Sequence, residues 1–135
     1  MLGKTISHYR ILGELGKGGM GVVYEAEDIR LGRRIALKML AANLAADPQA
    51  IKGFEHEARA ASALNHPNIC TVHDVGEHEG APFLVMERLE GQTLQARLKQ
   101  GPLSVAEIID VAIAVASGLQ AASEKGVVHR DLKPA

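Results

Sequence analysis

Hydrophobic positions alternate in a mostly strand-like way up to Leu40 and recur at mostly helical spacings after Asp47. The first part contains three β-compatible runs, at Tyr9 to Leu15, Val22 to Glu27 and Arg34 to Leu40. A cluster of glycines separates the first two runs. We therefore predict three consecutive antiparallel strands at the start of the chain.

The middle of the chain predicts a helix followed by two more strands. Asp47 can cap a helix that starts at Pro48, and Asn65-His66-Pro67 should end it. After this helix we expect strands at Ile69 to Val75 and Ala81 to Arg88, and then a short helix at Thr93 to Lys99.

A long last helix should begin at Ser104, which forms a capping-box pattern with Glu107, and should run to about Lys125 before a left-handed Gly126. Apolar residues surround most of this helix, which is typical of burial on several sides. If the chain ends at residue 135, helix 105–125 exposes apolar surface, and we expect self-association through it. The apolar residues are Ile108, Ile109, Val111, Ala112, Ile113, Val115, Ala116 and Leu119.

Composition is that of an ordinary globular chain, with 47% hydrophobic and 23% charged residues among 135. The 15 Lys and Arg residues nearly balance 16 Asp and Glu residues, and the net charge of −1 gives no electrostatic argument for a nucleic-acid partner. Arg30, Arg33 and Arg34 form a small cluster that we interpret as a solvated loop.

No feature of the sequence predicts export or membrane insertion. Cys70 is the only cysteine and cannot form an internal disulfide, and the first residues lack the apolar run of a signal peptide. The longest uninterrupted apolar stretch, Val111 to Ala116, is far shorter than the roughly 20 residues of a transmembrane helix. We expect a cytoplasmic protein with no membrane segment in this chain.

The glycine cluster Gly16-Lys17-Gly18-Gly19-Met20-Gly21-Val22-Val23 contains the pattern G-x-G-x-x-G-x-V. In a dinucleotide-binding domain the third glycine would open a helix, whereas β-branched residues follow it here, so the loop should join two strands. Such a hairpin can cover phosphates, because residues without side chains let backbone N–H groups approach them. A glycine-rich turn without a ligand remains an alternative.

Lys38 lies late in the third predicted strand, where Ala36 and Lys38 share one face. A lysine beside a small residue beneath a glycine flap suits a ligand that is apolar at one end and anionic at the other, as ATP is. The commoner role of a strand lysine is to keep a sheet edge soluble.

Glu57 should lie on the buried side of the first long helix, three residues after Phe54 in its apolar stripe. A buried carboxylate needs a cation, and Lys38 is the candidate. The alternative is that Glu57 lies at the edge of the stripe and reaches water. The stripe consists of Phe54, Ala58, Ala61 and Leu64.

The glycine loop, Ala-x-Lys, the helical Glu and the final His129-Arg130-Asp131 occur in the order and approximate spacing of the eukaryotic-like protein kinases. The chain resembles this family from about His8 to Ala135, and Gly16 to Tyr24 and Asn65 to Ile69 look most like bacterial serine/threonine kinases. The resemblance implies an α+β, protein-kinase-like fold, with a five-stranded antiparallel N-lobe sheet, one helix and the first helices of an incomplete helical C-lobe. ATP would bind between the lobes.

The resemblance also implies domain bounds. An N-terminal extension would cover residues 1–7, and a kinase domain would cover 8–135. Within it we expect an N-lobe at about 8–86, a hinge at about 87–91 and a partial C-lobe at about 92–135.

The same resemblance implies ATP as the cofactor. Lys38 would hold the α- and β-phosphates and Glu57 would orient Lys38. Val23 and Ala36 would pack on the adenine, with Met86 as gatekeeper before the hinge. The implied ATP-contacting residues are Leu15, Gly16, Lys17, Gly18, Gly19, Met20, Gly21, Val22, Val23, Ala36, Lys38, Met86, Glu87 and Leu89.

Two implied catalytic residues stand at the end of the chain. Asp131 would accept or orient the proton of a serine or threonine hydroxyl on a protein substrate, and Lys133 would neutralise the phosphoryl group in flight. Arg130 would contact a phosphorylated activation loop, and His129 would be structural. Without the family, these residues could form a solvated polar tail.

The family's catalytic-loop asparagine, its D-F-G motif and its activation loop do not occur within the 135 residues. Mg²⁺, expected for the complete domain, would thus lack its protein ligands here. We expect the N-terminal portion of a serine/threonine kinase that is inactive alone, or alternatively a non-catalytic nucleotide-binding or interaction fragment.

Overall fold

The computed structural model describes residues 1–19, 21–129 and 132–135. Met20, Arg130 and Asp131, which carry predictions above, lie outside the described residues. The chain divides into two units. The first unit comprises Met1–Ser62 and Cys70–Leu89, and the second comprises Ala63–Ile69 and Glu90–Ala135.

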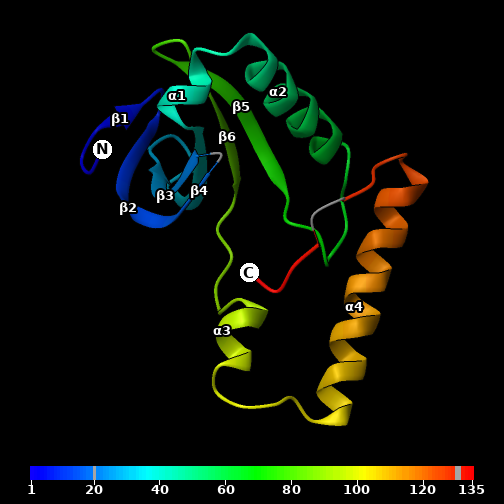
Figure 1. Ribbon diagram of the computed structural model, residues 1–135. Coiled ribbons are helices and arrows are strands. Elements are labelled where there is room, and N and C mark those ends of the chain that lie inside the picture. The colour runs from blue at the N-terminus through cyan, green and yellow to red at the C-terminus, as the bar shows by residue number, and fades with distance from the viewer. Residues whose placement is uncertain (20, 130–131) are drawn as a thin grey trace. The chain divides into compact units, whose positions relative to one another are not determined.

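The first unit is built on a curled antiparallel sheet with strand order β1-β2-β3-β4-β6-β5 (Figure 1). The described residues form six strands in this sheet rather than the predicted five, because Thr5 and Ile6 pair with Arg10 and Tyr9. Ile6 is fully buried, which explains why this short strand is held. The strands are β1 (Thr5–Ile6), β2 (Tyr9–Gly18), β3 (Gly21–Asp28), β4 (Arg33–Leu40), β5 (Val72–His78) and β6 (Ala81–Glu87).

The register of β3, β4 and β6 gives the sheet two chemically different faces. Tyr24 lies opposite Leu37, which lies opposite Val85, and side chains in such a row share a face. This face forms the hydrophobic core, in which Ile35, Leu37 and Val85 are fully buried. Neighbouring positions along each strand point to the other face.

Two helices follow β4. Helix α1 (Ala42–Ala45) was not predicted, because four residues are too few to show a helical period. Helix α2 (Pro48–Ser62) begins at the predicted proline, and the Asp47 carboxylate caps it by accepting a hydrogen bond from Gln49 N at 3.0 Å. Helix α2 contacts β5 and β6 and buries Phe54 and Ala58.

The second unit contains helices α3 (Leu94–Leu98) and α4 (Val105–Glu124). Ser104 caps α4 as predicted, because its side chain accepts from Glu107 N, while the Glu107 carboxylate pairs with Arg97 at 3.0 Å. Gly126 ends the helix with a φ of +74°, as expected.

Helix α4 also packs against the loop before β5. A Cβ added at Gly118 would lie 3.3 Å from the Asn68 carbonyl oxygen, so a glycine permits this close approach. Ser117 Oγ and His66 Nε2 are 3.1 Å apart and form a hydrogen bond. These contacts hold residues 63–69 to the second unit.

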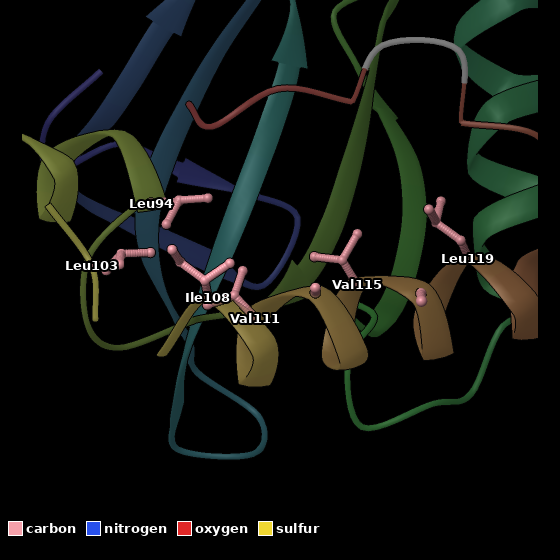
Figure 2. A pocket seen from close by; sticks show the side chains of 8 residues that line it. Leu94, Leu103, Ile108, Val111, Val115 and Leu119 are labelled. Carbon is pink, nitrogen blue, oxygen red and sulfur yellow. The ribbon is translucent and has the colours of Figure 1, made fainter. Parts of the chain in front are cut away.

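An apolar groove of about 440 Å³ runs along α4 in the second unit (Figure 2). Figure 2 shows Leu94, Leu103 and Ile108 turned toward one another at one end of it. By length and composition, α4 is also the one helix among the described residues that could cross a membrane. The buried core helix of a soluble protein passes the same test, so this finding alone assigns no membrane segment.

One hydrogen bond closes the curled sheet of the first unit. The buried Tyr9 on β2 donates its hydroxyl to Asp74 Oδ2 on β5 at 2.8 Å, although these strands are not neighbours in the sheet. The Tyr9 ring also meets Phe83 edge-on at a centroid distance of 6.2 Å. Burial, and then the bond to Asp74, raise the pKa of Tyr9 well above its ordinary value of 10.0.

This raised pKa gives the first prediction. Because only the unfolded chain releases the Tyr9 proton near pH 10, stability that is present below this pH should fall as the pH rises beyond it. Tyr9→Phe should cost about 1 kcal/mol at neutral pH and should remove this part of the alkaline loss. Urea unfolding from pH 7 to 11 measures both effects.

Tyr24→Phe is the matched control, since the Tyr24 hydroxyl makes no hydrogen bond within the described part of the chain. The Tyr24→Phe variant should lose stability at alkaline pH as the wild type does. Equal pH dependence in the wild type and Tyr9→Phe would contradict the prediction.

Candidate functional site

The sheet face opposite the core carries the predicted base-contacting residues. Ala36 lies between Glu25 and Met86 in the register, and Lys38 lies between Val23 and Leu84. Val23, Lys38 and Met86 are half-buried and Ala36 is buried. The structure thus gathers Val23, Ala36, Lys38 and Met86 on one surface, which we call the candidate face. Val22 points to the opposite face, because it is adjacent to Val23 in the same strand.

The glycine loop joins β2 to β3 as a hairpin, in agreement with the strand-to-strand prediction. Cβ atoms added at Gly16, Gly18 or Gly19 would meet nothing within 4 Å, and none of these three residues has a positive φ. The fold therefore gives no steric reason for glycine there. Leu15 and Lys17 are exposed beside them.

Gly21 differs from the other glycines of the loop. A Cβ at this position would lie 1.9 Å from the Met39 carbonyl oxygen, where β3 pairs with β4. Strand packing is thus sufficient to require glycine at the third glycine position of the pattern.

We expected Glu57 to lie on the buried side of α2. Its side chain is instead exposed. With about 100° of rotation per residue, Glu57 lies about 60° from Phe54 and about 100° from Ala58, at the edge of a narrow stripe. Lys38 and Glu57 are both described, and no ion pair within 4.0 Å joins them. The alternative considered for Glu57, that it reaches water, is the one observed.

The last residue of β6, Glu87, and the segment after it follow directly on Met86 of the candidate face. Glu87 donates its N–H to the Thr71 carbonyl at 2.8 Å, and its side chain accepts from Thr71 N at 3.1 Å. The Glu87 carbonyl oxygen also lies 3.7 Å from Cys70 Sγ, which donates to it. Leu89 is exposed at the end of the segment.

Sequence reasoning missed a charged cluster formed by Glu25, Arg34 and Arg88, which we call the Glu25 cluster. The Glu25 carboxylate lies 3.1 Å from an Arg34 nitrogen and 3.5 Å from Arg88 Nε. Arg33 and Arg34 begin β4 and are not part of a solvated loop, because they pair with Asp28 and Glu27. The hairpin register, which places Glu25 diagonally opposite Arg34, is the signal that could have revealed the pair.

The C-terminal residues are only partly described. Asp131 lies outside the described residues, and Lys133 is exposed. Among the described residues, no three His, Cys, Asp or Glu side chains gather as a metal site.

Comparison with known families places this arrangement in context. A family model described as "Protein kinase domain" matches residues 9–135. The solved kinase domain of Mycobacterium tuberculosis PknI is similar, with a TM-score of 0.86 and 33% identity over 100% of this chain and 56% of that one. The PpkA-294 apo form has a TM-score of 0.89 at 25% identity, covering 99% of this chain and 55% of that one.

Curated relatives are also similar over nearly the whole chain. Serine/threonine-protein kinase PrkC of Bacillus subtilis is 42% identical, with 99% of this chain and 21% of the relative covered. Serine/threonine-protein kinase PknA of Mycobacterium tuberculosis is 44% identical, with 98% of this chain and 32% of the relative covered. The chain therefore spans about a fifth to a third of the length of these relatives.

The contrast between Gly21 and Gly18 gives a prediction. Gly21→Ala should destabilise the fold by about 1–3 kcal/mol or more, because the new methyl group overlaps the Met39 carbonyl. Gly18→Ala meets no atom and should leave the unfolding free energy within about 1 kcal/mol of the wild type. Urea denaturation of the three proteins measures this difference, and equal stabilities of the two variants would contradict the account.

Proposed function

Because the chain belongs to the protein kinase domain family, we propose that its first unit binds ATP on the candidate face, as part of a domain that phosphorylates serine or threonine on proteins. The relatives' names support the serine/threonine class. The activity of the whole protein belongs to this proposal, since the chain spans only part of those relatives.

The observation that carries the proposal is the open space at Gly16, Gly18 and Gly19 above a face that bears Lys38. Glycine that neither packing nor backbone conformation requires fits a loop whose N–H groups approach a ligand. An apolar surface next to a cation matches the base and the phosphates of ATP, with Val23, Ala36 and Met86 on the adenine side and Lys38 at the α- and β-phosphates.

Glu57 would act in the nucleotide-bound state by approaching Lys38. This requires α2 to shift or turn relative to β4, because the two side chains are not paired in the structure. A carboxylate beside the lysine would direct its ammonium group at the phosphates. Our proposal for Asp131 and Lys133 is that they orient the substrate hydroxyl and neutralise the transferred phosphoryl group.

ATP binding in the presence of EDTA tests this proposal without relying on a metal. Lys38→Met should weaken binding roughly tenfold to a hundredfold, since a hydrogen bond to a charged group contributes about 1.5–3 kcal/mol. Gly18→Ala should also weaken binding, although its fold is intact. Isothermal titration calorimetry or ligand-detected NMR measures the affinity.

Lys52→Met, on the exposed side of α2, is the matched control for the loss of one positive charge. It should bind as the wild type does. Equal ATP affinity in Lys38→Met and the wild type would exclude the proposed role of Lys38.

A second candidate function is an interaction module, which the exposed apolar groove along α4 favours. An apolar surface of this kind is costly to leave in water. The proposed consequence is association between copies of the chain.

Light scattering at micromolar concentration measures this association. The wild type should have a mean mass above the monomer's 14.4 kDa. Ile108→Lys, inside the groove, should lower the mass, whereas Ile113→Lys, at an exposed position of α4 outside the groove, should change it less. A monomeric wild type that unfolds cooperatively would count against the proposal.

A further inference from the structure

The Glu25 cluster joins three separate parts of the first unit. Glu25 comes from β3, Arg34 from β4 and Arg88 from the segment after β6. The side chains of Glu25 and Arg88 are only 22% and 30% exposed, so the pair is partly shielded from water. Hydrogen bonding from Arg34, followed by the charge of Arg88, lowers the pKa of Glu25 from its ordinary value, which keeps the carboxylate ionised at neutral pH.

Arg88 connects this carboxylate to the chain that leaves the sheet. One terminal nitrogen of its guanidinium donates to the Leu89 carbonyl oxygen, and its Nε faces Glu25 at 3.5 Å. The Nε atom is buried and has no hydrogen-bond partner within the described residues. The ionised Glu25 carboxylate is therefore the group that compensates the burial of Arg88 Nε, beside the backbone of residue 89.

The cluster lies on the candidate face itself. Glu25, Ala36 and Met86 form one row across β3, β4 and β6, so the carboxylate stands beside the surface proposed for the base. The Leu89 carbonyl held by Arg88 belongs to the segment whose backbone groups would meet the base.

We propose that Glu25, Arg34 and Arg88 are positioning residues that brace the backbone of residues 87–89 for recognition of the nucleotide base. The inference rests on the proposed function of the candidate face and deepens it. Without the carboxylate, Arg88 loses its fixed position and the Leu89 carbonyl loses the donor that orients it. Recognition of the base should weaken, while recognition of the phosphates should not.

A second ion pair on the same strand provides a matched control. Glu27 lies on the same face of β3 and pairs with Arg10 on β2 at 2.6 Å. Its side chain is 35% exposed, and neither partner contacts residues 87–89 in any described interaction. Glu27→Gln thus removes one carboxylate charge from β3 without changing the Glu25 cluster.

The experiment compares adenosine and inorganic triphosphate binding to the full chain by NMR titration in EDTA. Glu25→Gln should weaken adenosine binding about two- to fivefold, the range expected for a partly exposed ion pair, and should leave triphosphate binding unchanged. Glu27→Gln should change neither. Arg88→Gln should match Glu25→Gln, and the double variant should lose no more than either single variant, because both changes break one interaction.

Backbone order parameters at Arg88 and Leu89, measured without nucleotide, test separately whether the Glu25 cluster holds this backbone in place. They should decrease in Glu25→Gln and stay constant in Glu27→Gln. Unchanged adenosine affinity together with unchanged order parameters in Glu25→Gln would overturn the inference. Equal weakening of adenosine and triphosphate binding would also overturn it, since that pattern indicates a general structural role. If the wild type binds neither ligand, the proposed function fails, and the order parameters still decide whether the brace exists.

Discussion

Backbone pairing places Tyr24 opposite Leu37 and Leu37 opposite Val85, and the rest of the first unit depends on this register. Because side chains alternate along a strand, the pairing that buries Leu37 and Val85 also forces Ala36, Lys38 and Met86 onto the opposite face. A slip by one residue would move Lys38 into the core, where an unpaired ammonium group is very costly. The same hydrogen bonds thus specify the core and assemble the candidate face.

Periodicity was sufficient to predict most elements of this fold. The three consecutive strands, the start of α2 at Pro48 and the Ser104 cap of α4 were confirmed, because each follows from local chemistry. The α+β class, which the family resemblance implied, was confirmed as well. The family resemblance was also confirmed. The candidate face could be predicted in part, since Ala36 and Lys38 must share a face in any regular strand.

The features that sequence could not reveal depend on contacts distant in the chain. Strand β1 is held by the burial of Ile6, and β5 starts three residues later than predicted, at Val72, because pairing with β6 sets its position. A helical wheel places Glu57 near the edge of the stripe, but the narrow width of the buried stripe follows from the contacts of α2 with β5 and β6, which the wheel does not contain. The Glu25 cluster was missed for the same reason, because Arg88 reaches Glu25 only after β6 pairs with β4.

The central claim is that a nucleotide binds on the sheet face that carries Val23, Ala36, Lys38 and Met86. The most direct measurement is an NMR titration of the isotope-labelled chain with ATP in EDTA, following the backbone amides of all assigned residues and the methyl groups of Val23, Ala36 and Met86. The account predicts the largest shifts at these three residues, at Lys38 and at Gly16 to Gly19, with small shifts at the core methyl groups of Leu37 and Val85. Shifts centred on the α4 groove, or none at saturating ATP, would contradict it.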